Sequence, residues 1–316
     1  MSIFFSSVKK LFIPHKGKNR LPRVRGELRE YEPLSKKNWF GVGGAAEYYF
    51  EPADEKDLAH FIKNKHDIPI SVLGGGSNIL IRDKGVAGVV IHLGKSFANI
   101  KTENNQIICG AGLLNIDLSR FAQKSALSGF EFLCGIPGSV GGALRMNAGA
   151  YGREIKDILV SLRFVDGNGT LQEITPDADF FDYRQNKLPD DWIFTGATFQ
   201  GTPDNADIIQ ERMNELKQKR ETNQPIGVKT CGSTFKNPEG LKAWQLIEKA
   251  GCKGLTIGDA CVSEKHCNFL INKHHATAQQ LEDLGEEVIR RVREKTGITL
   301  EWEIKRWGTP AKGDNE

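Results

Sequence analysis

The hydrophobic positions along the chain form two kinds of segment, short apolar runs and runs with helical spacing. The two kinds do not alternate strictly along the chain. Apolar runs bounded by glycine, proline or polar turns predict strands over 47–50, 70–73, 86–93, 107–109, 158–165, 170–174, 192–199, 268–272 and 298–304. Apolar residues three or four apart predict helices over 206–220, 241–250 and 278–296, with shorter ones around 58–62 and 116–122. This mixed order predicts an α+β protein of two domains, with a boundary just before Ala206.

Local signals support several of these elements. Asp166-Gly167-Asn168-Gly169 separates two predicted strands and is typical of a hairpin turn. Thr277 and Gln280 have the spacing of a capping box, which predicts the start of the last helix. Gly297 predicts its end.

Composition narrows the class of protein. Of the 316 residues, 39% are hydrophobic and 26% are charged, as in soluble proteins with a sizeable core. The net charge of +3 is too small to indicate nucleic-acid binding. No apolar run approaches the ~18 residues that span a membrane, and no cleavable signal peptide is visible. Six scattered cysteines favour a reduced, cytoplasmic protein, and Cys261, His266 and Cys267 match no zinc spacing, so no metal site is predicted.

Basic residues gather in one place, the N-terminal segment 1–25. A nucleic-acid or lipid-binding arm is one interpretation of this cluster, and a solvated, mobile tail is the other, which we favour. The cluster consists of Lys9, Lys10, Lys16, Lys18, Arg20, Arg23 and Arg25.

Two glycine-rich loops are the clearest functional signal. Gly74-Gly75-Gly76-Ser77-Asn78 follows the apolar strand 70–73, and the second loop, 135–142, contains Gly138, Ser139, Gly141 and Gly142. Glycines allow several backbone N–H groups to approach one anion closely, and a helix that begins in the second loop would favour a phosphate. Each loop alone could be a tight turn. Two together favour a backbone-lined groove for a cofactor that carries a pyrophosphate.

The common nucleotide-binding motifs do not explain these loops. Segment 41–46 fits the dinucleotide pattern G-x-G-x-x-A formally, but a strand that ends at Pro52 follows it instead of a helix. Segment 88–96 has one residue too many for a P-loop and ends a strand. The sequence therefore argues against a Rossmann dehydrogenase and a P-loop kinase.

In their residues and in their order along the chain, several segments resemble the UDP-N-acetylenolpyruvoylglucosamine reductases, the flavoenzymes of peptidoglycan precursor synthesis. The resemblance extends from about Leu34 to Gly308, and 232–238 is its most specific part. The first glycine loop alone is shared with many flavin oxidases. The matching segments are 38–44, 72–83, 129–152, 183–184, 232–238, 262–269 and 300–303.

The resemblance implies a fold, a cofactor and a reaction. It implies a two-lobed FAD-binding domain of the vanillyl-alcohol-oxidase (PCMH) type over 26–205, a smaller α+β substrate-binding domain over 206–309, and a short tail over 310–316. FAD would be bound tightly but non-covalently, with its pyrophosphate on the two glycine loops. NADPH would reduce the FAD and leave, and the enolpyruvyl sugar nucleotide would then accept the hydride and become UDP-N-acetylmuramate. We expect a monomer with small-molecule partners only.

Three residues match the catalytic residues of the family. Hydride addition to the enolpyruvyl group leaves negative charge that a cation must stabilise and an acid must protonate. By resemblance, Arg184 is that cation, Ser233 the proton donor and Glu303 the catalytic carboxylate. Without the resemblance, a surface arginine, a turn serine and an exposed carboxylate are the simpler interpretations. In a strand, Glu301 and Glu303 share a face, so only the family pattern selects Glu303.

Tyr183, Lys236 and Asn237 are expected to contact the substrate, although a half-buried tyrosine and a solvated lysine remain alternatives. Asn223 stands where many relatives carry a lysine, so the sequence does not identify the diphosphate contact at this position; Arg220 is a candidate to replace the lysine. No tyrosine-bearing loop is inserted between Phe199 and Ala206, which indicates the shorter subclass of the family.

Two other functions compete with the reductase. A flavin-dependent oxidase could use the same binding domain, often with a His or Cys near the first glycine loop as a covalent tether. His66 and His92 are the nearest such residues in sequence, and neither is in the loop. A non-catalytic nucleotide-binding module would not need Arg184, Ser233 and Glu303 together.

Overall fold

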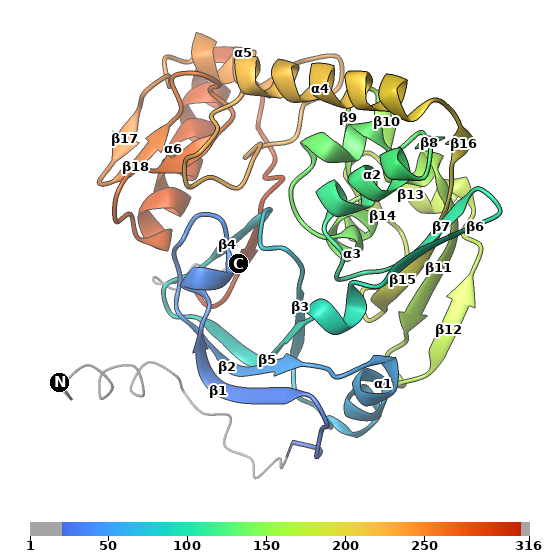
Figure 1. Ribbon diagram of the computed structural model, residues 1–316. Coiled ribbons are helices and arrows are strands. Elements are labelled where there is room, and N and C mark those ends of the chain that lie inside the picture. The colour runs from blue at the N-terminus through green and yellow to red at the C-terminus, as the bar shows by residue number, and fades with distance from the viewer. Residues whose placement is uncertain (1–20, 311–316) are drawn as a thin grey trace.

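The computed structural model describes residues 21–310. They form three bodies, which we call lobe 1, lobe 2 and the C-terminal domain (Figure 1). Lys9, Lys10, Lys16, Lys18 and Arg20 of the predicted basic tail lie outside the described residues, as do 311–316. Within the described part of the chain, no helix has both the length and the hydrophobicity to cross a bilayer.

Lobe 1 is a four-stranded sheet in the order β1-β2-β5-β3, with strands β1 (Glu27–Pro33), β2 (Ala45–Glu51), β3 (Ile70–Leu73) and β5 (Val86–His92). The pairs β2–β5 and β3–β5 are parallel, and β1 is antiparallel to β2. Helix α1 (Glu55–Asn64) is capped by Asp54 and buries Leu58, Phe61 and Ile62, as the sequence predicts. The strand predicted over 70–73 is confirmed.

Lobe 2 is an antiparallel sheet in the order β12-β11-β15-β7-β6. The predicted hairpin turn is confirmed, because it joins the antiparallel strands β11 and β12. Phe50 and Leu58 share a hydrophobic cluster with Val165 and Ile193, which joins lobe 2 to lobe 1. The strands are β6 (Ile100–Glu103), β7 (Gln106–Gly110), β11 (Leu159–Val165), β12 (Leu171–Ile174) and β15 (Ile193–Gln200), and the helices are α2 (Asn115–Lys124) and α3 (Val140–Arg145).

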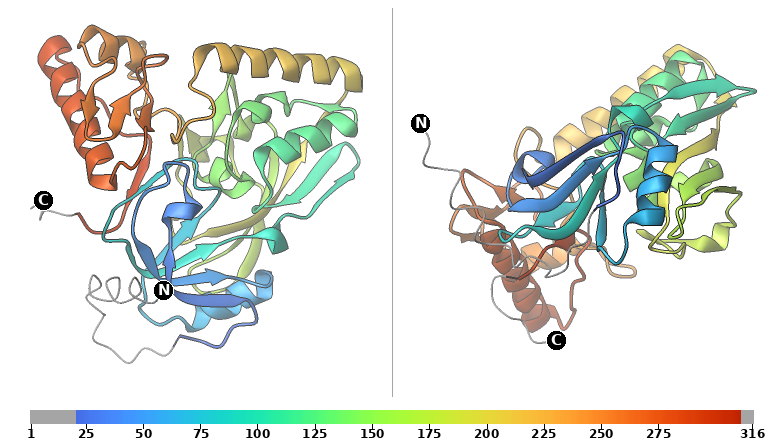
Figure 2. Two further views of the ribbon diagram at one scale, coloured as in Figure 1. Left: turned by 60° about the vertical axis from the view of Figure 1, so that its left-hand side comes forward. Right: turned by 90° about the horizontal axis from the view of Figure 1, so that it is seen from below.

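Helix α4 (Ala206–Asn223) lies along lobe 2 (Figures 1 and 2). The Tyr151 hydroxyl donates to the carbonyl oxygen of Leu216 at 3.0 Å, and the Gln123 side chain donates to the carbonyl oxygen of Ala206 at 3.0 Å. These contacts associate α4 with lobe 2, and the chain crosses to the C-terminal domain after the helix. The boundary predicted before Ala206 stays a prediction.

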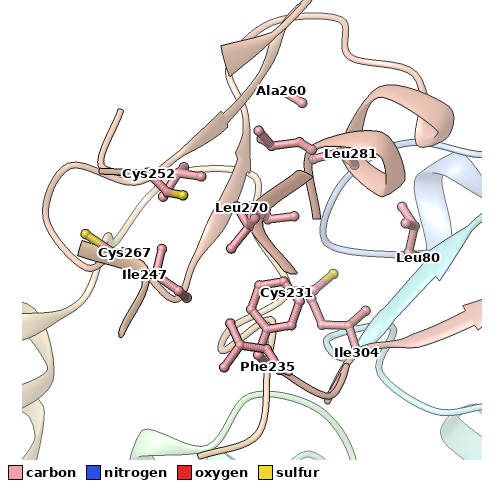
Figure 3. Packing of buried hydrophobic residues seen from close by; sticks show 14 of the residues in the cluster. Leu80, Cys231, Phe235, Ile247, Cys252, Ala260, Cys267, Leu270, Leu281 and Ile304 are labelled. Carbon is pink, nitrogen blue, oxygen red and sulfur yellow. The ribbon is translucent and has the colours of Figure 1, made fainter. Parts of the chain in front are cut away.

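The C-terminal domain combines the sheet β17-β18-β19 with two helices. Thr277 and Gln280 form the predicted capping box, and Gly297 ends the last helix with a φ of 76°. Leu80 of lobe 1 packs in the same hydrophobic cluster as Phe235 and Ile304 (Figure 3). The elements are α5 (Ala243–Lys249), β17 (Thr256–Ile257), β18 (Ala260–Val262), β19 (Leu270–Asn272), α6 (Ala278–Thr296) and β20 (Lys305–Trp307).

The strand predicted over 298–304 is wrong. Leu300 and Ile304 are buried, as in the predicted pattern, but the backbone makes only scattered bonds to the segment around Phe235. The regular pairing begins later, where β20 runs parallel to β4 (Ile79–Ile81) of lobe 1. The apolar spacing of residues 298–304 therefore predicts which side chains are buried, but it does not predict which segment the backbone pairs with.

A buried ion pair fastens the C-terminal domain to lobe 1. Arg82 follows β4 and donates from Nε and Nη2 to the Glu282 carboxylate of α6 at 2.9 and 2.7 Å. Arg306 also contacts this carboxylate, at 3.0 Å. Burial opposes ionisation of Glu282, but the hydrogen bonds and charges of Arg82 and Arg306 outweigh it and lower the pKa.

Glu282→Gln is expected to lower the free energy of unfolding by about 2–4 kcal/mol, because it removes the negative charge that Arg82 and Arg306 share. Urea denaturation measures the change. Glu286→Gln is the matched control. Glu286 lies on the same helix as Glu282 and also pairs with Arg306, but its side chain is about half exposed. We expect it to cost at most about 1 kcal/mol. Equal losses in the two variants would contradict this account.

Candidate active site

A cleft of about 1580 Å³ lies between the two lobes and the C-terminal domain. This volume exceeds the ~300–1,000 Å³ of sites for drug-sized ligands, so the cleft has room for a dinucleotide. Both glycine loops line it, together with Arg184, Ser233 and Glu303. Residues from three regions of the sequence thus face one space.

The two glycine loops are packed against each other, and glycine is required at the contact. A Cβ atom on Gly75 would lie 2.7 Å from the Cα of Gly138. At Gly76, where φ is 66°, a Cβ would lie 2.1 Å from the carbonyl oxygen of Lys37. The Ser77 hydroxyl donates to the carbonyl oxygen of Pro137 at 3.0 Å and so connects the loops. The result is a cradle of bare backbone, which fits the pyrophosphate of FAD.

Ser139 begins the short helix α3 in the second loop. It is the N-cap, and its hydroxyl accepts a hydrogen bond from the N–H of Gly142 at 3.5 Å. Gly141 and Gly142 form the first turn and line the cleft. The predicted helix start at this loop is confirmed.

Arg184 and Glu303 form an ion pair in the cleft, with 3.1 Å between Nε and Oε1. The tight turn between strands β13 (Phe181–Asp182) and β14 (Gln185–Asn186) carries Arg184 at a φ of 60°. Its Nη2 also donates to the carbonyl oxygen of Gly149 at 2.9 Å. The two side chains are only 19% and 16% exposed. Burial raises the pKa of Glu303, and the charge of Arg184 opposes that rise only in part.

Ser233 lines the same cleft, on a segment that several hydrogen bonds hold in place. Gly232 precedes it with a φ of 81°. The buried side chain of Asn268 accepts from the N–H of Phe235 at 2.9 Å and donates to its carbonyl oxygen at 2.8 Å. Thr234 also accepts from the N–H of Leu270 at 3.2 Å. The cleft wall therefore presents a serine hydroxyl, a guanidinium and a carboxylate on rigid supports.

Known proteins share this architecture. The profile described as "FAD binding domain" matches residues 46–175, and the profile described as "UDP-N-acetylenolpyruvoylglucosamine reductase, C-terminal domain" matches residues 224–307. The UDP-N-acetylenolpyruvoylglucosamine reductase of Parvibaculum lavamentivorans is 54% identical over 92% of this chain and 94% of its own length. The protein of the same name from Rickettsia bellii is 51% identical over 91% of this chain and 96% of its own length.

The chain belongs to the UDP-N-acetylenolpyruvoylglucosamine reductase family. The crystal structure of the Thermus caldophilus reductase agrees, with a TM-score of 0.77 and 35% identity over 90% of this chain and all of that one. The predicted fold class is confirmed: an FAD-binding domain of the PCMH type precedes the C-terminal domain of the reductases.

The residues predicted to contact substrate lie at the rim of the cleft instead of its wall. Asn237 and Tyr183 meet there, with 3.4 Å between Nδ2 and Oη. The Arg184 guanidinium lies 4.7 Å from the centre of the Tyr183 ring. Lys236 pairs with the exposed Glu301 at 3.3 Å. None of the three lines the cleft wall, so their contact with the substrate stays a prediction.

Arg220 lines the cleft, whereas Asn223 does not. Asn223 donates to the carbonyl oxygen of Lys219 within its own helix, at 2.9 Å. Arg220 Nε contacts the Gln224 side chain at 3.2 Å, where the chain leaves α4. The helical spacing alone did not show which basic residue of α4 faces the cleft.

Cys231 also lines the cleft, although sequence reasoning assigned it no role there. Its thiol lies 3.3 Å from the carbonyl oxygen of Ile79 and 3.8 Å from that of Gly76. A cysteine is therefore close to the first glycine loop in space, as an oxidase tether would be. However, burial raises the pKa of the Cys231 thiol to about 12, so the nucleophilic thiolate is scarce at neutral pH.

Proposed function

We propose that the chain catalyses the NADPH-dependent reduction of UDP-N-acetylenolpyruvoylglucosamine to UDP-N-acetylmuramate through bound FAD, in peptidoglycan precursor synthesis. The observation that carries the proposal is the Arg184–Glu303 pair, which faces the same cleft as Ser233 and the glycine cradle. A nucleotide-binding module would not need this pair, because two buried charges are costly unless they have a task.

Backbone amides of the two loops would hold FAD. Gly74, Gly75 and Gly76 supply one side of the cradle, and Gly138, Ser139, Gly141 and Gly142 supply the other. Bound FAD supplies hydride transfer from NADPH to the β carbon of the enolpyruvyl group. Because the Cys231 thiol has a raised pKa, we propose that the cofactor is bound non-covalently.

Arg184 would stabilise the charge that appears when hydride reaches the β carbon. The π electrons of the double bond then move onto the α carbon and its carboxylate. A guanidinium offers several N–H donors and can hold a carboxylate through two of them. Arg184 is already directed into the cleft by the carbonyl oxygen of Gly149 and by Glu303.

Ser233 would give its hydroxyl proton to the α carbon and complete the reduction. A serine is a weak acid in water, so its neighbours must favour the transfer. Glu303 is buried nearby and its raised pKa favours the protonated form more than in water. We propose that Glu303 orients Arg184 in the cleft and lies close to the reacting group.

Arg220 would bind the diphosphate of the sugar nucleotide in place of the lysine absent at Asn223. Arg220→Ala is expected to raise KM for the sugar nucleotide about tenfold with little change in kcat, because a charge-assisted hydrogen bond is worth about 1.5–3 kcal/mol. Steady-state kinetics measure both constants. Lys219→Ala, on the exposed side of α4, is the control. An unchanged KM in Arg220→Ala would remove Arg220 from the substrate site.

Tyr183, Lys236 and Asn237 at the rim would contact the sugar or phosphates. The connection from β15 to α4 contains only the two-residue strand β16 (Thr202–Pro203), which supports the shorter subclass without an inserted tyrosine loop. A monomeric state and a cytoplasmic location remain predictions from the sequence.

Product analysis tests the proposed function. Under anaerobic conditions, the purified yellow protein should consume one NADPH for each UDP-N-acetylmuramate formed, identified by mass spectrometry. Without the sugar nucleotide, NADPH consumption should stop once the bound FAD is reduced. Rapid NADPH consumption in air, with peroxide and no sugar product, would favour the oxidase alternative.

A further inference from the structure

The first glycine loop, which we propose binds the cofactor, also forms hydrogen bonds to the segment around Glu303. The side chain of Asn78, its last residue, donates from Nδ2 to the carbonyl oxygen of Glu303 at 3.2 Å. The backbone N–H of Lys305 donates to the carbonyl oxygen of Asn78 at 3.1 Å. These two bonds lie directly before the parallel pairing of β4 with β20, and the first of them joins residues 225 positions apart.

We propose that the side chain of Asn78 positions the Glu303 carboxylate, in addition to any role of its loop in binding FAD. The inference rests on the proposed catalytic role of Glu303. Glu303 is part of no regular strand, so few bonds hold its backbone. Its N–H donates to the carbonyl oxygen of Thr234 at 2.8 Å, and its carbonyl oxygen accepts from Asn78.

These two bonds decide where the carboxylate points. They fix the peptide units on both sides of the Glu303 Cα and therefore the direction of its Cα–Cβ bond. The side chain leaves in that direction to reach Arg184 at 3.1 Å. Without the Asn78 donor, the peptide unit after Glu303 would keep only the long bond from the N–H of Ile304 to the carbonyl oxygen of Thr234, at 3.4 Å. A small error in position is costly for a catalytic group.

The same loop is also connected to the segment that carries Ser233. The Cys231 thiol contacts the carbonyl oxygens of Ile79 and Gly76, on either side of Asn78. The first glycine loop is therefore a shared support: it lines the cleft, and it also contacts the segments that carry Glu303 and Ser233.

Two matched substitutions test the proposal. Asn78→Asp replaces the amide donor by a carboxylate, which can donate only when it is protonated. Asn272→Asp removes a comparable donor at the same domain boundary, since Asn272 donates to the carbonyl oxygen of Phe40 at 2.8 Å and does not line the cleft. In both variants we would measure the Kd for FAD, the rate of flavin reduction by NADPH, and the rate of reoxidation by the sugar nucleotide between about pH 4, near the ordinary pKa of an aspartate, and pH 8.

For Asn78→Asp at neutral pH, reoxidation should slow about tenfold, the loss expected from one buried hydrogen bond. Reduction by NADPH and the Kd for FAD should change less than about threefold. As the pH falls, the reoxidation rate should recover relative to the wild type, because the protonated carboxyl regains a donor. Asn272→Asp should lower the melting temperature and leave the ratio of the two half-reactions unchanged.

Three results would overturn the inference. One is a wild-type reoxidation rate in Asn78→Asp at all pH values. Another is a parallel loss of FAD affinity and of both half-reactions, which would make Asn78 a cofactor contact only. The third is an Asn272→Asp variant with the same selective loss. Failure of the proposed function is distinguishable from all three, since the wild type itself would then not be reoxidised by the sugar nucleotide.

Discussion

Ser233→Ala is expected to slow reoxidation of the reduced flavin by the sugar nucleotide by about two to four orders of magnitude, the usual contribution of a positioned acid. Reduction of the flavin by NADPH should stay within about threefold of the wild type, because that step transfers no proton to the α carbon. Anaerobic stopped-flow absorbance separates the two half-reactions. Asn268 holds the backbone of Phe235, two residues after Ser233, so the substitution should remove a hydroxyl and leave the segment in place.

Ser263→Ala is the matched control for Ser233→Ala. Ser263 is buried in the same domain, where its hydroxyl accepts from the N–H groups of Lys265 and His266 at 3.2 Å, and it does not line the cleft. Its loss should lower stability by about 1 kcal/mol and leave both half-reactions intact. If Ser233→Ala kept a wild-type reoxidation rate, Ser233 would not be the proton donor.

Gly75→Ala is expected to weaken FAD binding by at least about 100-fold. The added methyl group would lie 2.7 Å from the Cα of Gly138, so the two loops must separate. Neither backbone can move away without displacing the amides that we propose hold the pyrophosphate, and steric strain of this kind costs about 3 kcal/mol. Titration of the apoprotein with FAD, followed by quenching of flavin fluorescence, measures the Kd.

Gly94→Ala is the control for Gly75→Ala. It shows whether a glycine-to-alanine change weakens FAD binding at any position or only where the two loops meet. The nearest atom to a Cβ on Gly94 is 3.8 Å away, an ordinary contact, and Gly94 does not line the cleft. Its Kd for FAD should equal that of the wild type. Equal Kd values for Gly75→Ala and the wild type would show that the two loops do not form the cradle described above.

Elements defined by neighbouring residues could be predicted from the sequence. Strand β3 and the loop after it follow from an apolar run that ends in three glycines. Helix α6 follows from Thr277, Gln280 and Gly297, each of which acts on backbone groups within four residues of itself. The family resemblance then supplied the order of the domains, which these local signals alone do not determine.

Features that depend on distant partners could not be predicted in this way. Residues 298–304 have the burial pattern of a strand, but their hydrogen bonds go to the segment around Phe235 and to Asn78. Arg82 and Glu282 are 200 positions apart, and nothing in either local sequence indicates the pair. Cys231 lies near the first glycine loop only because the C-terminal domain packs against lobe 1.

One measurement tests the central claim, that this cleft transfers hydride from NADPH to an enolpyruvyl sugar nucleotide. The FAD-loaded protein is reduced anaerobically with one equivalent of NADPH, and UDP-N-acetylenolpyruvoylglucosamine is then added. We predict that the flavin absorbance returns in full and that an equal amount of UDP-N-acetylmuramate is formed. A flavin that stays bleached until oxygen is admitted, with the sugar nucleotide unchanged, would contradict the account.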